Sequence, residues 1–337
     1  MPVSVFSRSI ELIKKYELGS EKDKNYLFIR ISDIKIGLRG DIFVLDSGNN
    51  CLKKYSKEYK FITEVGKKGQ GPGEMSGPLG FTLDKDDNIY LNDIGNRRIN
   101  IYDSNLIFVK TIPLKEDKTY KGLFFDDNNH LIFLCSPRHI KEKYFYVYTS
   151  EGDLLYSFFP VFRPDAPKLT STEHFLSTPQ SVLYYLPEAA INPERNIIAF
   201  TYKIPENPYR IYFINLKGDV IKIFEKRLKN YNPREQIDSS LKKAKFPRDE
   251  YLSISGLHFT KEGFLIVQKK IDAYQKGKFL FIKHLSDIFS ASGKILKEDL
   301  VTEPILAVDG ENNIYAVRED ETGEIKIVIY SLQIRDN

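Results

Sequence analysis

Three titratable residues stand at or just before runs that are expected to form inner β-strands: Asp33, Glu188 and His258. A carboxylate or imidazole at such a position could exchange protons with a bound molecule, and Glu188 is the most interesting because a proline precedes it and two alanines follow. A lone carboxylate is not a catalytic pair. His139 and His174 have no Ser or Cys nucleophile beside them that the sequence identifies. We therefore assign no catalytic residue.

Short acidic turns raise the possibility of calcium binding, because Asp and Asn supply hard oxygen ligands. The turns DKDDN, at 84–88, and DDNNH, at 126–130, lack the D-x-[DN]-x-[DN]-G spacing and its distal Glu. Solvated tight turns are the favoured interpretation. The two cysteines, Cys51 and Cys135, also lack metal-ligand spacing and are too few for a disulfide framework. We expect two buried, reduced thiols, no metal and no cofactor.

Composition favours strands over helices and excludes some partners. The 337 residues are 42% hydrophobic and include 21 Tyr and 23 Phe but no Trp, which suits β-sheets. Fifty basic residues against 46 acidic ones give a net charge of +4, which is not the footprint of a dedicated nucleic-acid binder. No apolar run is long enough to span a membrane. The first 18 residues have no apolar leader core, which read literally indicates the cytoplasm, although a chain whose leader has been removed would look the same.

The chain repeats itself with a period of 47 residues. The stretch that begins at Asp41, DIFVLDSGNNCLKKYSKEYKFI, aligns without a gap with the stretch that begins at Asn88, NIYLNDIGNRRINIYDSNLIFV. Five identities fall in register: Asp46 on Asp93, Gly48 on Gly95, Asn49 on Asn96, Tyr55 on Tyr102 and Phe61 on Phe108. Each copy alternates apolar runs with Gly/Asn turns, the pattern of antiparallel strands joined by hairpins.

Six such units can be traced when a turn rich in Asp, Asn or Gly followed by an apolar strand is taken as the anchor. A repeat of 40–50 residues with four short strands, here called a to d, is typical of a propeller blade. We therefore predict one all-β domain over 1–337, a six-bladed β-propeller with blades at about 27–65, 78–114, 120–160, 186–226, 252–298 and 303–331.

The sixth unit runs out of chain after its strand c, at Ile325–Tyr330. The segment Ser9–Leu18 alternates like a strand, and we predict that it supplies the missing outer strand. On this assignment the two cysteines lie two blades apart, beyond the roughly 7 Å limit between Cα atoms for a disulfide.

The segments DSGNN–LKKY, DIGNRRINIYD and GKKGQGPGEMSGP resemble those of bacterial NHL-repeat six-bladed propellers, a group that is commonly exported or lipid-anchored and largely of undefined function. The resemblance is good over about residues 27–115 and supports fold far better than activity. It implies export to the periplasm or cell surface, with the cytoplasm as the other possibility. Some similar propellers are lactonase-like hydrolases or streptogramin lyases with a site at the channel mouth, but none of their motifs matches here. An enzyme of that kind is the alternative to a binding or scaffold module, which we favour.

Loop length indicates which end of the blades binds a ligand. The a–b turns are short, whereas the large insertions fall on the end formed by the b–c loops and the d–a connectors. These insertions are Gly66–Pro78, Pro137–Lys143, Val161–Tyr185, Lys203–Pro208, Arg227–Tyr251 and Lys270–Gly277, with a short helix expected over Arg234–Lys245.

Cations and aromatic residues gather in these insertions and suit a protein or carbohydrate ligand, an anionic one if the cations contact it. The alternative is that the cations lie in water and the aromatic residues hold the long loops down. The chain is expected to be a monomer that binds no nucleic acid. The candidate ligand-binding residues are Arg138, His139, Arg163, His174, Tyr184, Glu188, Tyr231, Lys242, Lys243, Tyr251 and Tyr274.

Overall fold

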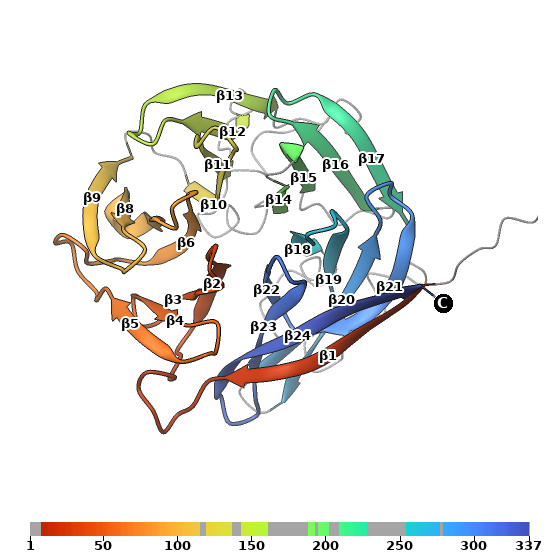
Figure 1. Cartoon of the computed structure of the whole chain (residues 1–337), viewed down its shortest axis with the longest axis horizontal. Coiled ribbons are helices and arrows are strands. Elements are labelled where there is room, and N and C mark those ends of the chain that lie inside the picture. Colours follow the sequence, from red (N-terminus) through yellow and green to blue (C-terminus); the bar gives the residue numbers. More distant parts are fainter. Residues whose placement is uncertain are drawn as a thin grey trace, which may run out of the picture. The chain divides into compact units, whose positions relative to one another are not determined.

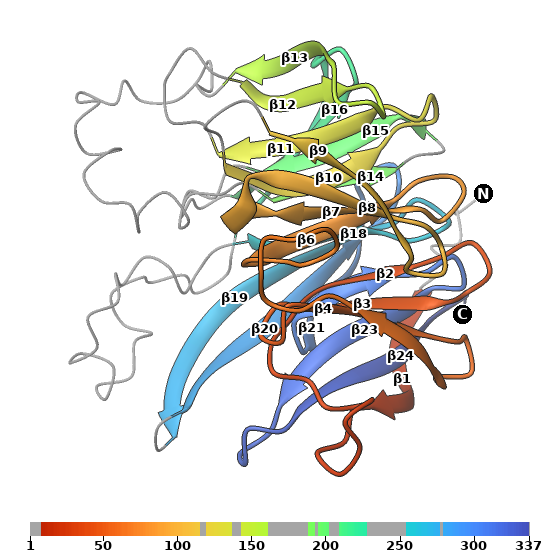
Figure 2. The ribbon, with the colours of Figure 1, turned by 90° about the vertical axis from the view of Figure 1, so that its left-hand side faces the viewer.

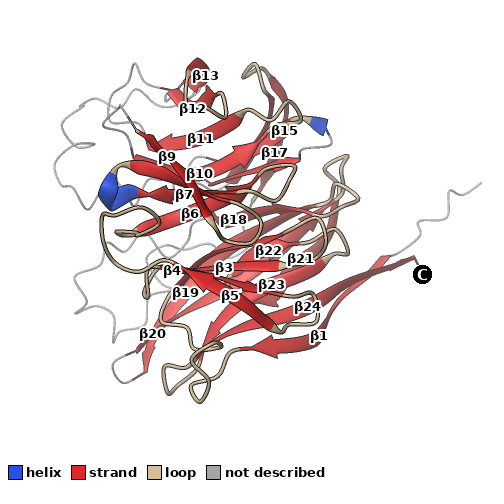
Figure 3. Ribbon diagram, turned by 60° about the vertical axis from the view of Figure 1, so that its left-hand side comes forward, coloured by secondary structure: helices blue, strands red, loops and turns tan. Residues whose placement is uncertain are grey.

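The regular secondary structure of the described residues is almost entirely β-strand (Figure 3). The computed structural model describes residues 8–114, 119–136, 143–160, 188–192, 195–201, 209–227, 254–276 and 279–336. Two compact units divide the chain: unit 2 is Ile29–Tyr231, and unit 1 combines Met1–Phe28 with Asn232–Asn337. No helix among the described residues is long and apolar enough to cross a membrane.

Unit 2 contains four antiparallel sheets, each made of four strands that are consecutive in sequence (Figure 1). These are blades one to four, and in each the strands a to d follow in chain order. Their bounds are β2 (Ile31–Ile36), β3 (Ile42–Asp46), β4 (Cys51–Tyr55) and β5 (Phe61–Val65); β6 (Pro78–Leu83), β7 (Ile89–Asp93), β8 (Arg98–Tyr102) and β9 (Phe108–Pro113); β10 (Thr119–Phe125), β11 (Leu131–Ser136), β12 (Lys143–Tyr148) and β13 (Leu154–Pro160); β14 (Glu188–Asn192), β15 (Ile197–Thr201), β16 (Tyr209–Asn215) and β17 (Val220–Lys226).

Unit 1 contains the last two sheets, and one of them joins the two ends of the chain. Blade five is β18 (Ile254–Phe259), β19 (Leu265–Lys276), β20 (Phe279–Phe289) and β21 (Ile295–Thr302). Blade six has the order β22 (Ile305–Val308), β23 (Asn313–Glu319), β24 (Ile325–Asp336) and β1 (Arg8–Leu18). The pairing of Ser9–Leu18 with the strand that begins at Ile325 confirms the predicted outer strand, and all six predicted units are present among the described residues.

The tight turns after β6 and β10 have the same pattern of hydrogen bonds from turn amides to an Asp side chain. The turn after β6 is fixed by Asp84, whose Oδ1 accepts the amides of Asp86 and Asn88 at 2.9 Å each, while Asp87 adopts a left-handed φ of 60°. Asp126 and His130 repeat this arrangement after β10. A short side chain that accepts amides two and four residues ahead suits a three-residue hairpin loop. The local sequence therefore fixes strand pairing without help from distant residues.

Apolar clusters lie between consecutive blades within each unit. Strands β3, β4 and β7 are buried along their whole length, because both faces of their sheets are covered. Phe43 and Leu52 of blade one pack with Phe81 and Leu91 of blade two, and in unit 1 Ile266 and Ile288 pack with Ile314. Such a sheet cannot bury its faces alone, so each blade depends on its neighbour.

The structure corrects one predicted loop. Lys270–Gly277 was expected to be an inserted loop, but residues 270–276 continue strand β19, which pairs with β20 as far as Lys276 opposite Phe279. The β-branched and aromatic residues of IDAY, at 271–274, and FLFI, at 279–282, have high strand propensity, so the two strands continue to pair where a loop was expected. Figure 2 shows this long light-blue hairpin.

Both cysteines are free and buried, as predicted. Cys51 begins β4 and Cys135 lies near the end of β11, two blades further on. Burial raises the pKa of the Cys51 thiol to about 12, and the nearby Asp46 carboxylate acts in the same direction.

Removal of residues 1–18 should lower the melting temperature sharply. The deletion exposes the edge of β24 and removes Ile10 and Leu18, which are 3% and 1% exposed. Burial of two such side chains contributes roughly 3–6 kcal/mol, before any loss of strand pairing. Thermal unfolding followed by circular dichroism measures the change. A control that lacks only residues 1–7 retains β1 and should have the melting temperature of the intact protein. Equal melting temperatures for all three proteins would contradict a stabilising role for the pairing of β1 with β24.

Both thiols should be inert toward Ellman's reagent in the folded protein. Thiolate is the reactive form, and with a pKa near 12 the thiolate fraction of Cys51 at pH 8 is on the order of 10⁻⁴. We expect two thiols to titrate in guanidinium and neither to react rapidly without it. A fast phase equal to one thiol in the native protein would show that a cysteine is accessible.

Candidate functional site

The end of strand b carries the most developed polar cluster of blade one. Asp46 is fully buried, and its two oxygens accept the backbone amides of Ile29 at 3.0 Å and Arg30 at 2.9 Å. The Asn49 side chain donates to the same carboxylate at 2.8 Å. Asp46 therefore holds the chain where it enters strand a of its own blade.

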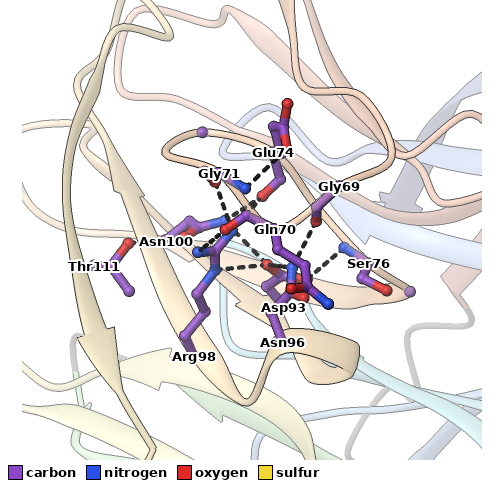
Figure 4. A network of polar contacts seen from close by, with 12 residues as sticks. Gly69, Gln70, Gly71, Glu74, Ser76, Asp93, Asn96, Arg98, Asn100 and Thr111 are labelled. Carbon is purple, nitrogen blue, oxygen red and sulfur yellow. Dashed lines mark hydrogen bonds and ion pairs between the residues drawn. The ribbon is translucent and has the colours of Figure 1, made fainter.

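Asp93 repeats this arrangement one period later (Figure 4). Its Oδ1 accepts the amide of Ser76 at 2.6 Å, and Ser76 lies 47 residues after Ile29, as Asp93 does after Asp46. Its Oδ2 accepts the Asn96 side chain at 2.7 Å and Nε of Arg98 at 2.9 Å. The repeat seen in the sequence is thus a repeat of hydrogen bonds.

Arg98 extends the cluster into the connector at 66–78. Its guanidinium donates to the carbonyls of Gln70, Gly71 and Glu74 at 2.9, 2.9 and 2.8 Å. The Glu74 carboxylate accepts the Gly71 amide at 2.8 Å, and this bond, with the Lys67 ammonium beside it, lowers the pKa of Glu74. A Cβ at Gly69 would lie 2.0 Å from Glu74 Oε2, so a larger residue there would displace the Glu74 carboxylate. The Gly-rich connector is therefore a folded loop.

This cluster stabilises the fold and is not placed for chemistry. Asp93 is 0% exposed, and each of its oxygens already accepts hydrogen bonds from the protein. The Arg98 guanidinium donates hydrogen bonds to one carboxylate and three carbonyls. What the cluster can present to a ligand is the surface of the connector that it holds, including the exposed Lys67.

The three titratable residues of the inner strands lie in three different blades, one, four and five. Asp33 accepts the amide of Phe81 at 3.0 Å and the Lys35 ammonium at 2.6 Å, so it links blade one to blade two. Glu188 is half-buried at the start of β14, opposite Thr201. His258, in β18, belongs to unit 1, whereas the other two belong to unit 2.

The acidic turns are less solvated than expected. Asp84 and Asp126 are 8% and 7% exposed because their carboxylates cap turn amides, as described above. The expectation of tight turns holds, but these carboxylates are structural and not surface groups. Among the described residues, no group of three or more His, Cys, Asp or Glu is placed to hold a metal ion.

Sequence reasoning missed a buried ion cluster in blade five. The Lys269 ammonium, 3% exposed, lies 2.7 Å from Asp287 Oδ2 and 2.8 Å from Asp299 Oδ1. Lys269 stands four residues after the start of strand b, as Asp46 does, so the repeat itself was the available signal. At this position blade five replaces an acid with a base, which requires new acids from β20 and β21.

Two of the candidate ligand-binding residues fall within the described part of the chain. Glu188 begins β14, and Tyr274 lies in β19, opposite Phe281 in the backbone register. The other nine lie outside the described residues: Arg138, His139, Arg163, His174, Tyr184, Tyr231, Lys242, Lys243 and Tyr251. The helix expected over Arg234–Lys245 lies outside them too.

Comparison with known families decides the fold family. A family described as 6-bladed beta-propeller matches residues 20–189, just over half of the chain. The chain belongs to this six-bladed β-propeller family. The human NHL repeat-containing protein 3 is 33% identical over 69 residues, which make up 20% of each chain. This match supports the predicted NHL-type repeat and covers only a fifth of that relative.

Solved structures agree on the propeller fold and differ in function. A member of the DUF4221 family from Bacteroides vulgatus has a TM-score of 0.68 at 9% identity, with 97% of this chain and 99% of that one covered. A candidate exported protein from Bacteroides fragilis has a TM-score of 0.57 at 14% identity, with 99% and 98% covered. Virginiamycin B lyase from Staphylococcus aureus has a TM-score of 0.51 at 14% identity, with 97% and 90% covered. At these identities the likeness extends to the fold alone.

Replacement of Asp93 by Ala should destabilise the protein by about 3–5 kcal/mol, because it leaves a largely buried guanidinium without its counter-ion. Urea unfolding at neutral pH measures the loss. Asp103→Ala is the matched control, since Asp103 caps two amides of an exposed turn. It should cost about 1 kcal/mol. Equal costs for the two variants would contradict a central role for Asp93.

Proposed function

We propose that the chain is a binding propeller that recognises an anionic partner at the end of the blades formed by the b–c loops and the d–a connectors. The observation that carries the proposal is the hairpin of blade five. Strands β19 and β20 have 12 and 11 residues, whereas β3 and β4, the equivalent pair in blade one, have 5 each. A blade does not need this extension to pair its own strands, so a role outside folding is the simplest account of it.

Charge supports an anionic partner. From Lys270 to Lys283 the hairpin sequence has four lysines and one Asp, and the other predicted insertions carry further cations. These include Arg138, Lys141, Lys143, Arg163, Lys168, Lys242, Lys243 and Lys245. A cluster of one sign speeds the approach of an oppositely charged macromolecule. The ligand is thus an acidic protein or a charged glycan.

Export completes the proposal. The resemblance to exported bacterial propellers and the similar fold of the candidate exported protein from Bacteroides fragilis support a periplasmic or cell-surface location. At either place a monomeric binding module would meet both kinds of ligand.

Reversal of three charges at this end should weaken retention on anionic columns. The variant Lys242→Glu, Lys243→Glu, Lys245→Glu should elute from heparin and from poly-glutamate at lower salt than the wild type, because Coulomb attraction to the matrix is reduced. A lower elution salt on only one of the columns would identify the ligand class, glycan or acidic peptide.

The matched control makes the same change in net charge on the opposite ends of the blades. Arg39, Lys85 and Lys261 lie exposed in a–b turns, and their replacement by Glu also removes six units of positive charge. We expect this variant to elute close to the wild type. If the two triple variants shifted equally, retention would depend on net charge alone and the assignment of the binding end would be wrong.

A further inference from the structure

The pairing of strand β21 with its neighbour β20 ends at Thr302, where the chain turns toward β22. The Gln268 side chain donates to Thr302 Oγ1 at 3.0 Å and to the carbonyl of Glu303 at 2.8 Å, and it accepts the amide of Ile305 at 3.1 Å. Gln268 is 1% exposed. These bonds hold the connector that turns into β22, and Pro304, which has no amide hydrogen, cannot continue a ladder.

Strand β20 therefore extends beyond its outer neighbour. The last pair between β20 and β21 is His284 with Thr302, whereas the pairing of β20 with β19 continues to Phe279. Within the described part of the chain, Phe279–Lys283 has a paired strand on the β19 side and none on the other. A strand edge of this kind presents unpaired backbone donors and acceptors.

The register indicates which backbone groups are available. Lys276 pairs with Phe279, and only two residues separate them, so they flank a two-residue hairpin connection and exchange hydrogen bonds. In an antiparallel ladder such pairs alternate with pairs whose N–H and C=O groups point outward. By this alternation the backbone groups of Leu280 and Ile282 are directed away from β19.

The sequence of this edge lacks the usual protection. Phe279–Ile282 contains no charge, proline or glycine, and three of its four residues are aromatic or β-branched. Other outer strands carry such devices: Lys110 in β9, Pro160 at the end of β13 and Lys297–Asp299 in β21. In the sequence, Lys276, Lys278 and Lys283 lie on either side of the bare edge, and Asp272 is the one acid between residues 270 and 283. An extended acidic segment would match the positive charge of the lysines and could form hydrogen bonds with the unpaired backbone groups of this edge.

We propose that Phe279–Lys283 is a strand-addition site for an extended segment of a partner protein in which acidic and apolar residues alternate. Main-chain hydrogen bonds to Leu280 and Ile282 would provide the affinity, and the flanking lysines would select acidic side chains. This inference rests on the proposed binding function and specifies the partner as a protein.

Random dodecamers displayed on phage, selected on the immobilised full-length protein, provide the test. The expected winners alternate acidic and apolar residues. A synthetic peptide of the winning sequence should bind Leu280→Pro at least about tenfold more weakly than the wild type, because proline removes one outward donor. The control Leu280→Ala keeps that donor and should bind within about threefold of the wild type. Melting curves show that both variants are folded.

Several outcomes would overturn the inference. Selected peptides without acidic residues, or peptides that bind Leu280→Pro as tightly as the wild type, exclude strand addition at this edge. Self-association of the wild type in sedimentation velocity that Leu280→Pro abolishes would make a second copy the occupant. Flotation of the wild type and Leu280→Pro alike with anionic phosphatidylglycerol vesicles, in place of peptide binding, would assign a lipid surface.

The two proposals fail separately. Retention on heparin and poly-glutamate depends on Lys242, Lys243 and Lys245, and Leu280→Pro leaves these charges in place. Peptides that do not discriminate between Leu280→Pro and the wild type, with column retention still lost in the Lys triple variant, would reject strand addition and keep the binding end. The reverse pattern would keep the edge and reject the wider cationic surface.

Discussion

The return of the chain from the outer strand of one blade to the first strand of the next is the constraint on which the fold depends. The backbone that makes this crossing leaves one sheet before it enters another, so its amides need partners from side chains. In blades one and two the partner is an aspartate at the end of strand b, Asp46 or Asp93. These carboxylates are completely buried, and the hydrogen bonds that they accept from amides and from Arg98 offset the free-energy cost of removing them from water.

Later blades keep the position and change the chemistry. Four residues after the start of strand b stand Cys135, Thr201 and Lys269 in blades three to five. In blade six Arg318 stands four residues after Ile314, which pairs with Val308 at the end of strand a. The Thr201 hydroxyl donates to the carbonyl of Arg210, and Arg318 pairs with Glu17 of the N-terminal strand. In blade six this position therefore joins β23 to the N-terminal strand β1. In blades four to six the residue type at this position changes, but its side chain still forms a hydrogen bond or an ion pair.

Features with a local cause could be predicted from the sequence. The turns could be found because one short polar side chain sets each of them, as Asp84 does, and the N-terminal strand could be found because blade six lacked an edge. The site could not be predicted as well. Lys269 depends on Asp287 and Asp299, which are 18 and 30 residues away and follow no period. The sequence predicts a loop where the hairpin of blade five extends, because the length of this hairpin breaks the repeat that sets the other boundaries.

Blade five combines a buried ionic cluster with a strand segment that has no outer neighbour among the described residues. Lys269, Asp287 and Gln268 are all at most 2% exposed and fix β19, β20 and the connector to one another at the base of the hairpin. Beyond that base, the strands leave the sheet as a pair. A two-stranded ribbon is marginally stable in water without further support. A buried ionic base lowers the entropy that a partner strand must overcome when it orders the ribbon, because one end is already fixed. For the proposed strand addition, the polar cluster that replaced the acid of the repeat would thus also fix the base of the edge that binds the partner.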